Sequence, residues 1–178
     1  MESNFYQQLE NSSASRKSRD LNCELALENP ENLKIVFDLA FDLENKNHFK
    51  AWWCLELVLE KELLLITSYL DFFTATISKY QHDSAIRPIS KICMFLAKAK
   101  SITLTRKQEK QLIETCLDWL IQEEKVATKA YAIRALYEFS KKHLWIKNEL
   151  KTILTQDYSL HSYAYQAVAR EILKKLNK

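Results

Sequence analysis

Glycine is absent from this chain of 178 residues, and proline occurs only twice, at Pro30 and Pro88. At the average frequency of about 7%, a chain of this length would carry roughly a dozen glycines. Glycine supplies the positive φ angles that tight hairpin turns and bulges require, so its absence disfavours a sheet of many strands. Helix interiors lose nothing without it. The composition therefore predicts an all-α fold.

The same absence excludes three classes of functional site. The Walker phosphate loop, the dinucleotide-binding G-x-G-x-x-G turn and the G-x-S-x-G nucleophile elbow each need backbone conformations or close approaches that only glycine permits. None of them can be built from a chain without glycine.

Apolar side chains recur at helical spacing along most of the chain. Leu33, Val36, Phe37, Ala40 and Phe41 follow the i, i+3, i+4, i+7, i+8 pattern of one helix face. That helix begins at Pro30, which suits a first helical turn, and we expect it to end before residues 45–47. The same criteria predict further helices over about 15–28, 48–60, 63–78, 84–98, 106–122, 126–142, 145–155 and 160–176.

Four of these helices begin with similar segments. The segments are Ala51–Leu57, Asp83–Ile89, Ala130–Leu136 and Ser162–Val168, and their starts are offset by 32, 47 and 32 residues. A polar, basic connector near residues 99–105 explains the long middle offset. Internal repeats of this length are typical of stacked helix pairs, in which neighbouring pairs bury the apolar face that one pair leaves open.

The repeated pattern resembles the HEAT-like repeats of the armadillo-type superhelix. The order of small residues, Arg and Leu in Ala132-Ile133-Arg134-Ala135-Leu136 matches that pattern, and Ala85-Ile86-Arg87-Pro88-Ile89 matches it including the proline. The resemblance implies a right-handed α-α superhelix, a short α-solenoid of about four helix pairs. It implies one domain over residues 1–178, with an N-terminal cap at about 1–30 and repeats over about 31–178.

Charge is distributed unevenly along the chain. Residues 1–80 hold 8 Lys and Arg against 13 Asp and Glu, a net charge of −5, whereas residues 81–178 hold 18 against 10, a net charge of +8. Such asymmetry marks either a surface for nucleic acid or an acidic protein, or simply differently charged solvated faces of one solenoid.

Six residues are candidates for partner binding. Trp52 and Trp53 are adjacent, and because neighbours on a helix are about 100° apart, only one of them can face the core fully. Arg87 and Arg134 occupy equivalent repeat positions, where they either contact the preceding repeat or cap backbone carbonyls, or else face a ligand. Lys141 and Lys142 belong to a basic group with Lys147 and Lys151, which could neutralise phosphates, although glutamates are interleaved with it.

Residues typical of catalysis or metal binding do not form recognisable pairs. The four histidines show no H-E-x-x-H or H-x-x-x-H spacing, and the four isolated cysteines are expected to be buried free thiols. The i, i+4 carboxylate pairs Asp38/Asp42 and Glu56/Glu60 could serve as acid and base, but solvated helix faces carry such pairs more often. We therefore expect no enzyme activity, no metal and no cofactor.

The sequence thus predicts a non-catalytic HEAT-like scaffold that binds a protein or peptide partner on its concave face. The alternative is a nucleic-acid-binding HEAT-like protein related to the DNA alkylation-repair proteins of this fold. The N-terminal residues lack the features of a signal peptide, and no apolar stretch is long enough to span a membrane, so a cytoplasmic location is expected.

Overall fold

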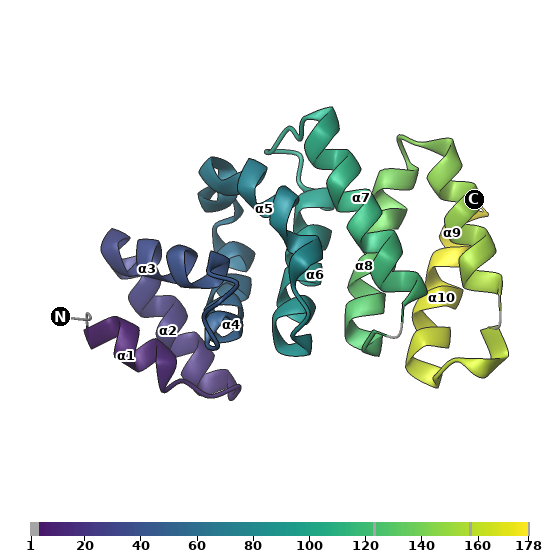
Figure 1. The fold of residues 1–178 in the computed structure, drawn as a ribbon. Helices are drawn as coiled ribbons and strands as arrows, with labels where there is room; N and C mark the ends of the chain where they lie inside the picture. Colours follow the sequence, from purple (N-terminus) through teal and green to yellow (C-terminus); the bar gives the residue numbers. More distant parts are fainter. Residues whose placement is uncertain (1–3, 123, 157, 178) are drawn as a thin grey trace. The chain divides into compact units, whose positions relative to one another are not determined.

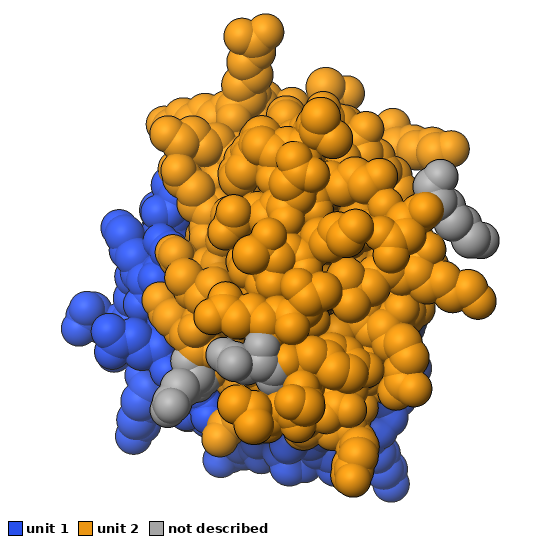
Figure 2. Space-filling view, turned by 90° about the vertical axis from the view of Figure 1, so that its right-hand side faces the viewer, with its two compact units in different colours: residues 1–92 blue, residues 93–178 orange. Residues whose placement is uncertain are grey.

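The computed structural model describes residues 4–122, 124–156 and 158–177, and every regular element within these ranges is helical. The all-α prediction is therefore confirmed. The helices group into two compact units, residues 1–92 (unit 1) and residues 93–178 (unit 2), which Figure 2 colours separately. The boundary falls within helix α6 (Asp83–Lys98). A single domain over 1–178, with a separate cap at about 1–30, stays a prediction.

Unit 1 is built from three longer helices, four short ones and the first part of α6, and Figure 1 shows their order along the chain. Before α6 they are α1 (Asn4–Glu10), α2 (Arg16–Glu28), α3 (Pro30–Phe41), α4 (His48–Lys61), the 3₁₀ helix η1 (Leu63–Tyr69), α5 (Leu70–Thr76) and the 3₁₀ helix η2 (Ile77–Lys79). Helices α2, α3 and α4 pack on one another, and α1 packs against α3 and α4. Trp52, Phe37 and Phe73 are the largest fully buried side chains of this unit.

Local signals set the helix starts. The Asn29 side chain accepts a hydrogen bond from the Glu31 N–H, and Pro30 follows as the first helical residue of α3. Thr105 begins α7 (Arg106–Ile121) with a reciprocal capping box, in which its hydroxyl accepts from the Gln108 N–H and the Gln108 side chain accepts from the Thr105 N–H. Both starts lie where the sequence predicts them.

The single helix predicted over residues 63–78 does not form. The segment is divided into η1, α5 and η2, and only α5 has α-helical hydrogen bonding. The Thr67 hydroxyl donates to the Leu64 carbonyl at 2.7 Å, and the Thr76 hydroxyl donates to the Phe72 carbonyl at 2.8 Å. Thr155 makes the same kind of bond within the regular helix α9, so these bonds accompany the 3₁₀ turns and do not by themselves explain them.

Unit 2 contains the end of α6 and four further α-helices. They are α7, α8 (Val126–Ser140), α9 (Leu144–Thr155) and α10 (Tyr163–Leu176), with the 3₁₀ helix η3 (Tyr158–Leu160) before α10. Helix α8 packs against α7, α9 and α10, and α9 also packs against α10. Leu112, Leu136, Phe139 and Leu150 are buried at these contacts. All four cysteines of the chain are buried free thiols, as predicted.

Candidate functional site

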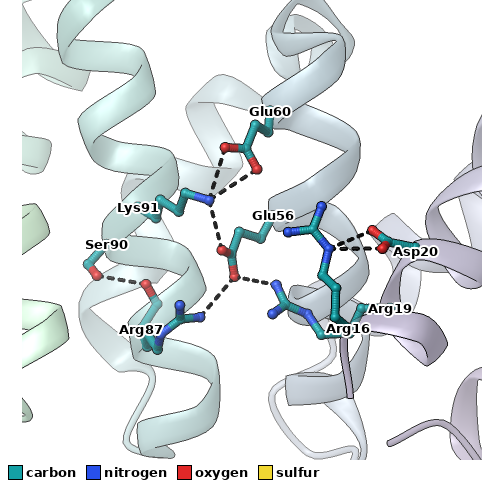
Figure 3. Close-up of polar contacts among 8 residues, drawn as sticks. All are labelled: Arg16, Arg19, Asp20, Glu56, Glu60, Arg87, Ser90 and Lys91. Carbon is teal, nitrogen blue, oxygen red and sulfur yellow. Dashed lines mark hydrogen bonds and ion pairs between the residues drawn. The ribbon is translucent and has the colours of Figure 1, made fainter. Parts of the chain in front are cut away.

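A buried carboxylate organises the polar contacts of unit 1. Glu56 lies on α4 with its side chain 2% exposed, and it accepts hydrogen bonds from cations on two other helices (Figure 3). Arg19 Nη2 of α2 lies 2.8 Å from Glu56 Oε2, and Arg87 Nη1 of α6 lies 3.1 Å from the same oxygen. Lys91 Nζ of α6 lies 3.1 Å from Glu56 Oε1. Three cations thus surround one carboxylate and connect α2, α4 and α6.

Burial of a carboxylate is costly unless opposite charges and hydrogen bonds replace its water. Lys91 also reaches Glu60 at 3.1 Å, so it bridges both carboxylates of α4. Burial alone would lower the pKa of Lys91, but its hydrogen bonds to Glu56 and Glu60 outweigh burial and raise that pKa. The interpretation of Glu56/Glu60 as a solvated pair is therefore wrong for Glu56. Its apolar neighbours on every side, Leu55, Leu57, Val58 and Leu59, are the signal that it would be buried.

The two repeat-position arginines both form ion pairs between helices. Arg87 contacts Glu56 on α4, and Arg134 of α8 contacts Glu171 of α10 at 3.1 Å. Glu171 also accepts from Lys175 at 2.7 Å, and these two cations, Lys175 foremost, lower its pKa. Arg87 thus contacts the preceding repeat, as the structural alternative from the sequence expects, whereas Arg134 contacts the following one. Partner binding by Arg87 and Arg134 stays a prediction.

The two adjacent tryptophans have different environments, as their angular separation requires. Trp52 has no exposed surface and packs edge-on against Phe41 and Tyr80, so it is a core residue and not a partner contact. Trp53 is partly exposed and meets Phe49 edge-on, with ring centroids 5.0 Å apart. Of the two tryptophans, only Trp53 has an exposed surface that a partner could contact.

Lys141 and Lys142 lie at an open pocket of about 390 Å³ in unit 2. The pocket, here named the lysine pocket, lies where α8 and α10 end and α9 begins. It is lined by Tyr137, Ser140, Lys141, Lys142, Leu144, Lys147, Lys175 and Leu176. The ammonium groups of Lys141 and Lys175 lie 4.8 and 5.7 Å from the centroid of the Tyr137 ring. Lys175 joins the group through the fold alone, since it lies far from the other three lysines in sequence.

A second pocket, of about 370 Å³, is lined by residues of α7 and of the segment that leads into α9. This Trp145 pocket is lined by Arg106, Glu109, Lys110, Ile113, Glu114, His143 and Trp145. Glu109 fixes its inner wall, because His143 Nε2 lies 2.6 Å from Glu109 Oε1 and Lys142 Nζ lies 3.8 Å from Glu109 Oε2. Trp145 is 54% exposed, and the adjacent Leu144 is 71% exposed.

Trp145 is not among the six residues that the sequence predicts as partner-binding candidates, although a signal for it exists. Helix α9 buries Ile146, Leu150 and Leu154 at i, i+4, i+8 spacing. Trp145 precedes this stripe by one residue, about 100° away around the helix, and so faces outward. The stripe on α9 therefore locates an exposed tryptophan that composition alone does not reveal.

The described residues contain no group of three or more His, Cys, Asp or Glu side chains placed to hold a metal ion. Within the same residues, no helix is both long enough and apolar enough to cross a membrane.

A family model described as a HEAT repeat domain matches residues 5–176, nearly the whole chain. The chain belongs to the HEAT repeat family. The predicted resemblance is confirmed, and the helical-repeat fold of the HEAT protein follows from it. No curated protein and no solved structure matches the chain. The match begins at residue 5, so it includes α2 and all of α1 except Asn4.

Proposed function

We propose that this HEAT protein is a non-catalytic scaffold that binds a protein or peptide partner through unit 2. The observation that carries the proposal is the exposed pair Leu144 and Trp145 beside the Trp145 pocket, which has Ile113 in its wall. Exposed tryptophans that border a pocket are frequent anchors of protein interfaces. HEAT repeats are generally scaffolds, and the family match supports that role. Binding on the concave face stays a prediction.

The paired acidic and basic groups support a structural or binding role over catalysis. Glu56 is neutralised by three cations and is 2% exposed, so it offers no accessible base. The His143–Glu109 pair lies in the Trp145 pocket, but Ser, Thr and Cys are absent from the residues that line it. A base without an adjacent hydroxyl or thiol does not form a nucleophilic pair. A cytoplasmic location belongs to the same proposal and is supported by the four buried free thiols.

Nucleic-acid binding is the second candidate, and it is favoured by one observation. Unit 2 holds 16 Lys and Arg against 9 Asp and Glu, a net charge of +7, whereas unit 1 holds 10 against 14, a net charge of −4. A positive surface attracts phosphates, and that attraction weakens steeply as salt concentration rises. Titration with duplex DNA at low and then at physiological salt tests this candidate, which fails if no binding occurs at low salt.

Selection of peptides from a display library against the folded full-length chain tests the leading proposal. We expect enrichment of peptides whose affinity falls at least about tenfold in Trp145→Ala, as the loss of one interface anchor predicts. Phe72→Ala is the matched control, because Phe72 is an aromatic residue of unit 1 with a similar exposure of 51%. Circular dichroism confirms that both variants retain their helices.

The proposal fails if selection enriches no peptide, or if every enriched peptide binds Trp145→Ala and the wild-type chain equally. It also fails if Phe72→Ala weakens binding as much as Trp145→Ala, since the anchor would then not lie at the Trp145 pocket.

A further inference from the structure

The lysine pocket concentrates positive charge without a carboxylate in its lining. Four of its eight lining residues are lysines, and none is acidic. The ammonium groups of Lys141 and Lys175 are held near the same Tyr137 ring, although they come from different helical segments. Like charges gathered in this way repel one another, and an anion placed among them relieves that repulsion. The pocket therefore favours a negatively charged ligand group.

The surroundings limit how much negative charge the pocket accepts. Outside the lining, Lys141 pairs with Glu138, Lys142 with Glu109 and Lys175 with Glu171. Among the described residues, Lys147 Nζ has no ion-pair partner. Because Arg134 shares Glu171 with Lys175, the four lysines and Arg134 stand against three glutamates, which leaves a local excess of two positive charges. A dense row of phosphates would be repelled by the three glutamates. One or two carboxylates, by contrast, could pair with Lys147 after small shifts of the neighbouring lysines.

The lining of the pocket also has apolar residues, which suit a ligand with an apolar group beside its charged one. Leu144 and Leu176 belong to the lining, and Trp145 follows Leu144 on the outer face of α9. The α8–α9 turn with the start of α9, residues 141–147, contributes lining residues to both pockets. One peptide crossing this segment could therefore contact the lysine pocket and the Trp145 pocket together.

We propose that the partner segment is an acidic peptide, whose Asp or Glu carboxylate binds among Lys141, Lys142, Lys147 and Lys175 while a neighbouring apolar side chain packs against Leu144 and Trp145. This inference rests on the proposed function and specifies its partner by chemistry. Charge complementarity at the lysine pocket provides its main support, and Lys147 is the residue on which binding depends most.

The test uses the peptides selected against the wild-type chain. We expect Asp and Glu to be enriched in the peptides that depend on Trp145, and Lys147→Ala to weaken their binding about tenfold. Lys151→Ala is the matched control, because Lys151 lies one turn further along α9, is exposed and does not line the pocket. It should change affinity less than about twofold.

A double-mutant cycle separates direct pairing from a general charge effect. Peptides with Gln or Asn in place of the acidic residues should bind the wild-type chain as weakly as the acidic peptides bind Lys147→Ala. They should lose little more when Lys147 is also replaced. Circular dichroism of each variant establishes that the helices are intact.

Four results would overturn the inference. The acidic partner is refuted if the Trp145-dependent peptides are not enriched in Asp and Glu. It is also refuted if they lose equal affinity for Lys147→Ala and Lys151→Ala. In both cases the scaffold proposal still stands. Duplex DNA that displaces the acidic peptides and itself depends on Lys147 would identify a phosphate site instead. If no Trp145-dependent peptide is found, the proposed function fails and this inference fails with it.

Discussion

Replacement of Glu56 by Gln should destabilise unit 1 strongly, because it leaves clustered cations without their shared carboxylate. Of the three cations, Arg19 is the least able to exchange the carboxylate for water, since its side chain is only 14% exposed. Arg87 is 41% exposed and can turn toward water, and Lys91 keeps Glu60. Removal of one partner from a buried ion pair costs about 3–5 kcal/mol. With one cation left largely uncompensated, we expect about 3 kcal/mol.

Urea unfolding measures this loss. With a slope of about 2 kcal/mol per molar urea, a loss of about 3 kcal/mol lowers the midpoint by about 1.5 M. Trp52 and Trp53 lie on α4 together with Glu56, so their fluorescence reports on the affected helix. Glu60→Gln is the matched control: its side chain is 44% exposed and pairs with Lys91 alone, so its loss should cost under about 1 kcal/mol.

A double variant identifies the source of the loss. Arg19→Gln combined with Glu56→Gln removes the stranded guanidinium along with the carboxylate, and should be more stable than Glu56→Gln alone. The reasoning is refuted if Glu56→Gln falls within about 1 kcal/mol of the wild-type chain. It is equally refuted if the double variant recovers no stability.

Three further predictions follow from local features. Thr105→Ala removes half of the capping box of α7 and should lower the free energy of unfolding by about 1 kcal/mol, measured by urea denaturation. The four cysteine thiols should not react with Ellman's reagent until the chain unfolds, because all four are buried and burial raises the pKa of Cys54 and Cys93. Reaction of even one thiol in the native chain would contradict this prediction. Burial also raises the pKa of Tyr80, whose hydroxyl donates to the Ala40 carbonyl at 2.7 Å. The unfolded chain then loses the Tyr80 proton at lower pH than the folded chain does, so stability should fall as pH rises above about 10, and phenolate absorbance should show Tyr80 ionising last.

Helix positions were predictable because their signals are local. Pro30 and Thr105 each mark a helix start through contacts with residues at most three positions away. Over the predicted helix 63–78 the apolar spacing fits an α-helix, yet the chain there forms the 3₁₀ helices η1 and η2 around the short helix α5. Apolar periodicity indicates which face of a segment is buried, but it does not indicate whether the backbone forms α-helical or 3₁₀ hydrogen bonds.

The candidate sites were predictable only in part, since they depend on contacts that are distant in sequence. Glu56 meets partners 31, 35 and 37 residues away, and a single sequence does not record such pairings. Lys141 and Lys142 were identified from their neighbours in the chain, whereas Lys175 reaches the same pocket from α10. Trp52 and Trp145 carry the same side chain with opposite exposure, which the packing of α4 and α9 decides.

The Glu56 contacts also bear on how this repeat array can change in length. Solenoids commonly gain or lose whole units, because each helix pair interacts with its immediate neighbours through similar surfaces. Here the carboxylate of α4 requires Arg19 from the helix pair before it and Arg87 from the helix after it. Deletion or duplication of a helix pair between residues 16 and 91 would bury an unmatched charge. Modular growth of this protein should therefore be confined to residues outside that segment, while residues 16–91 are inherited as one block.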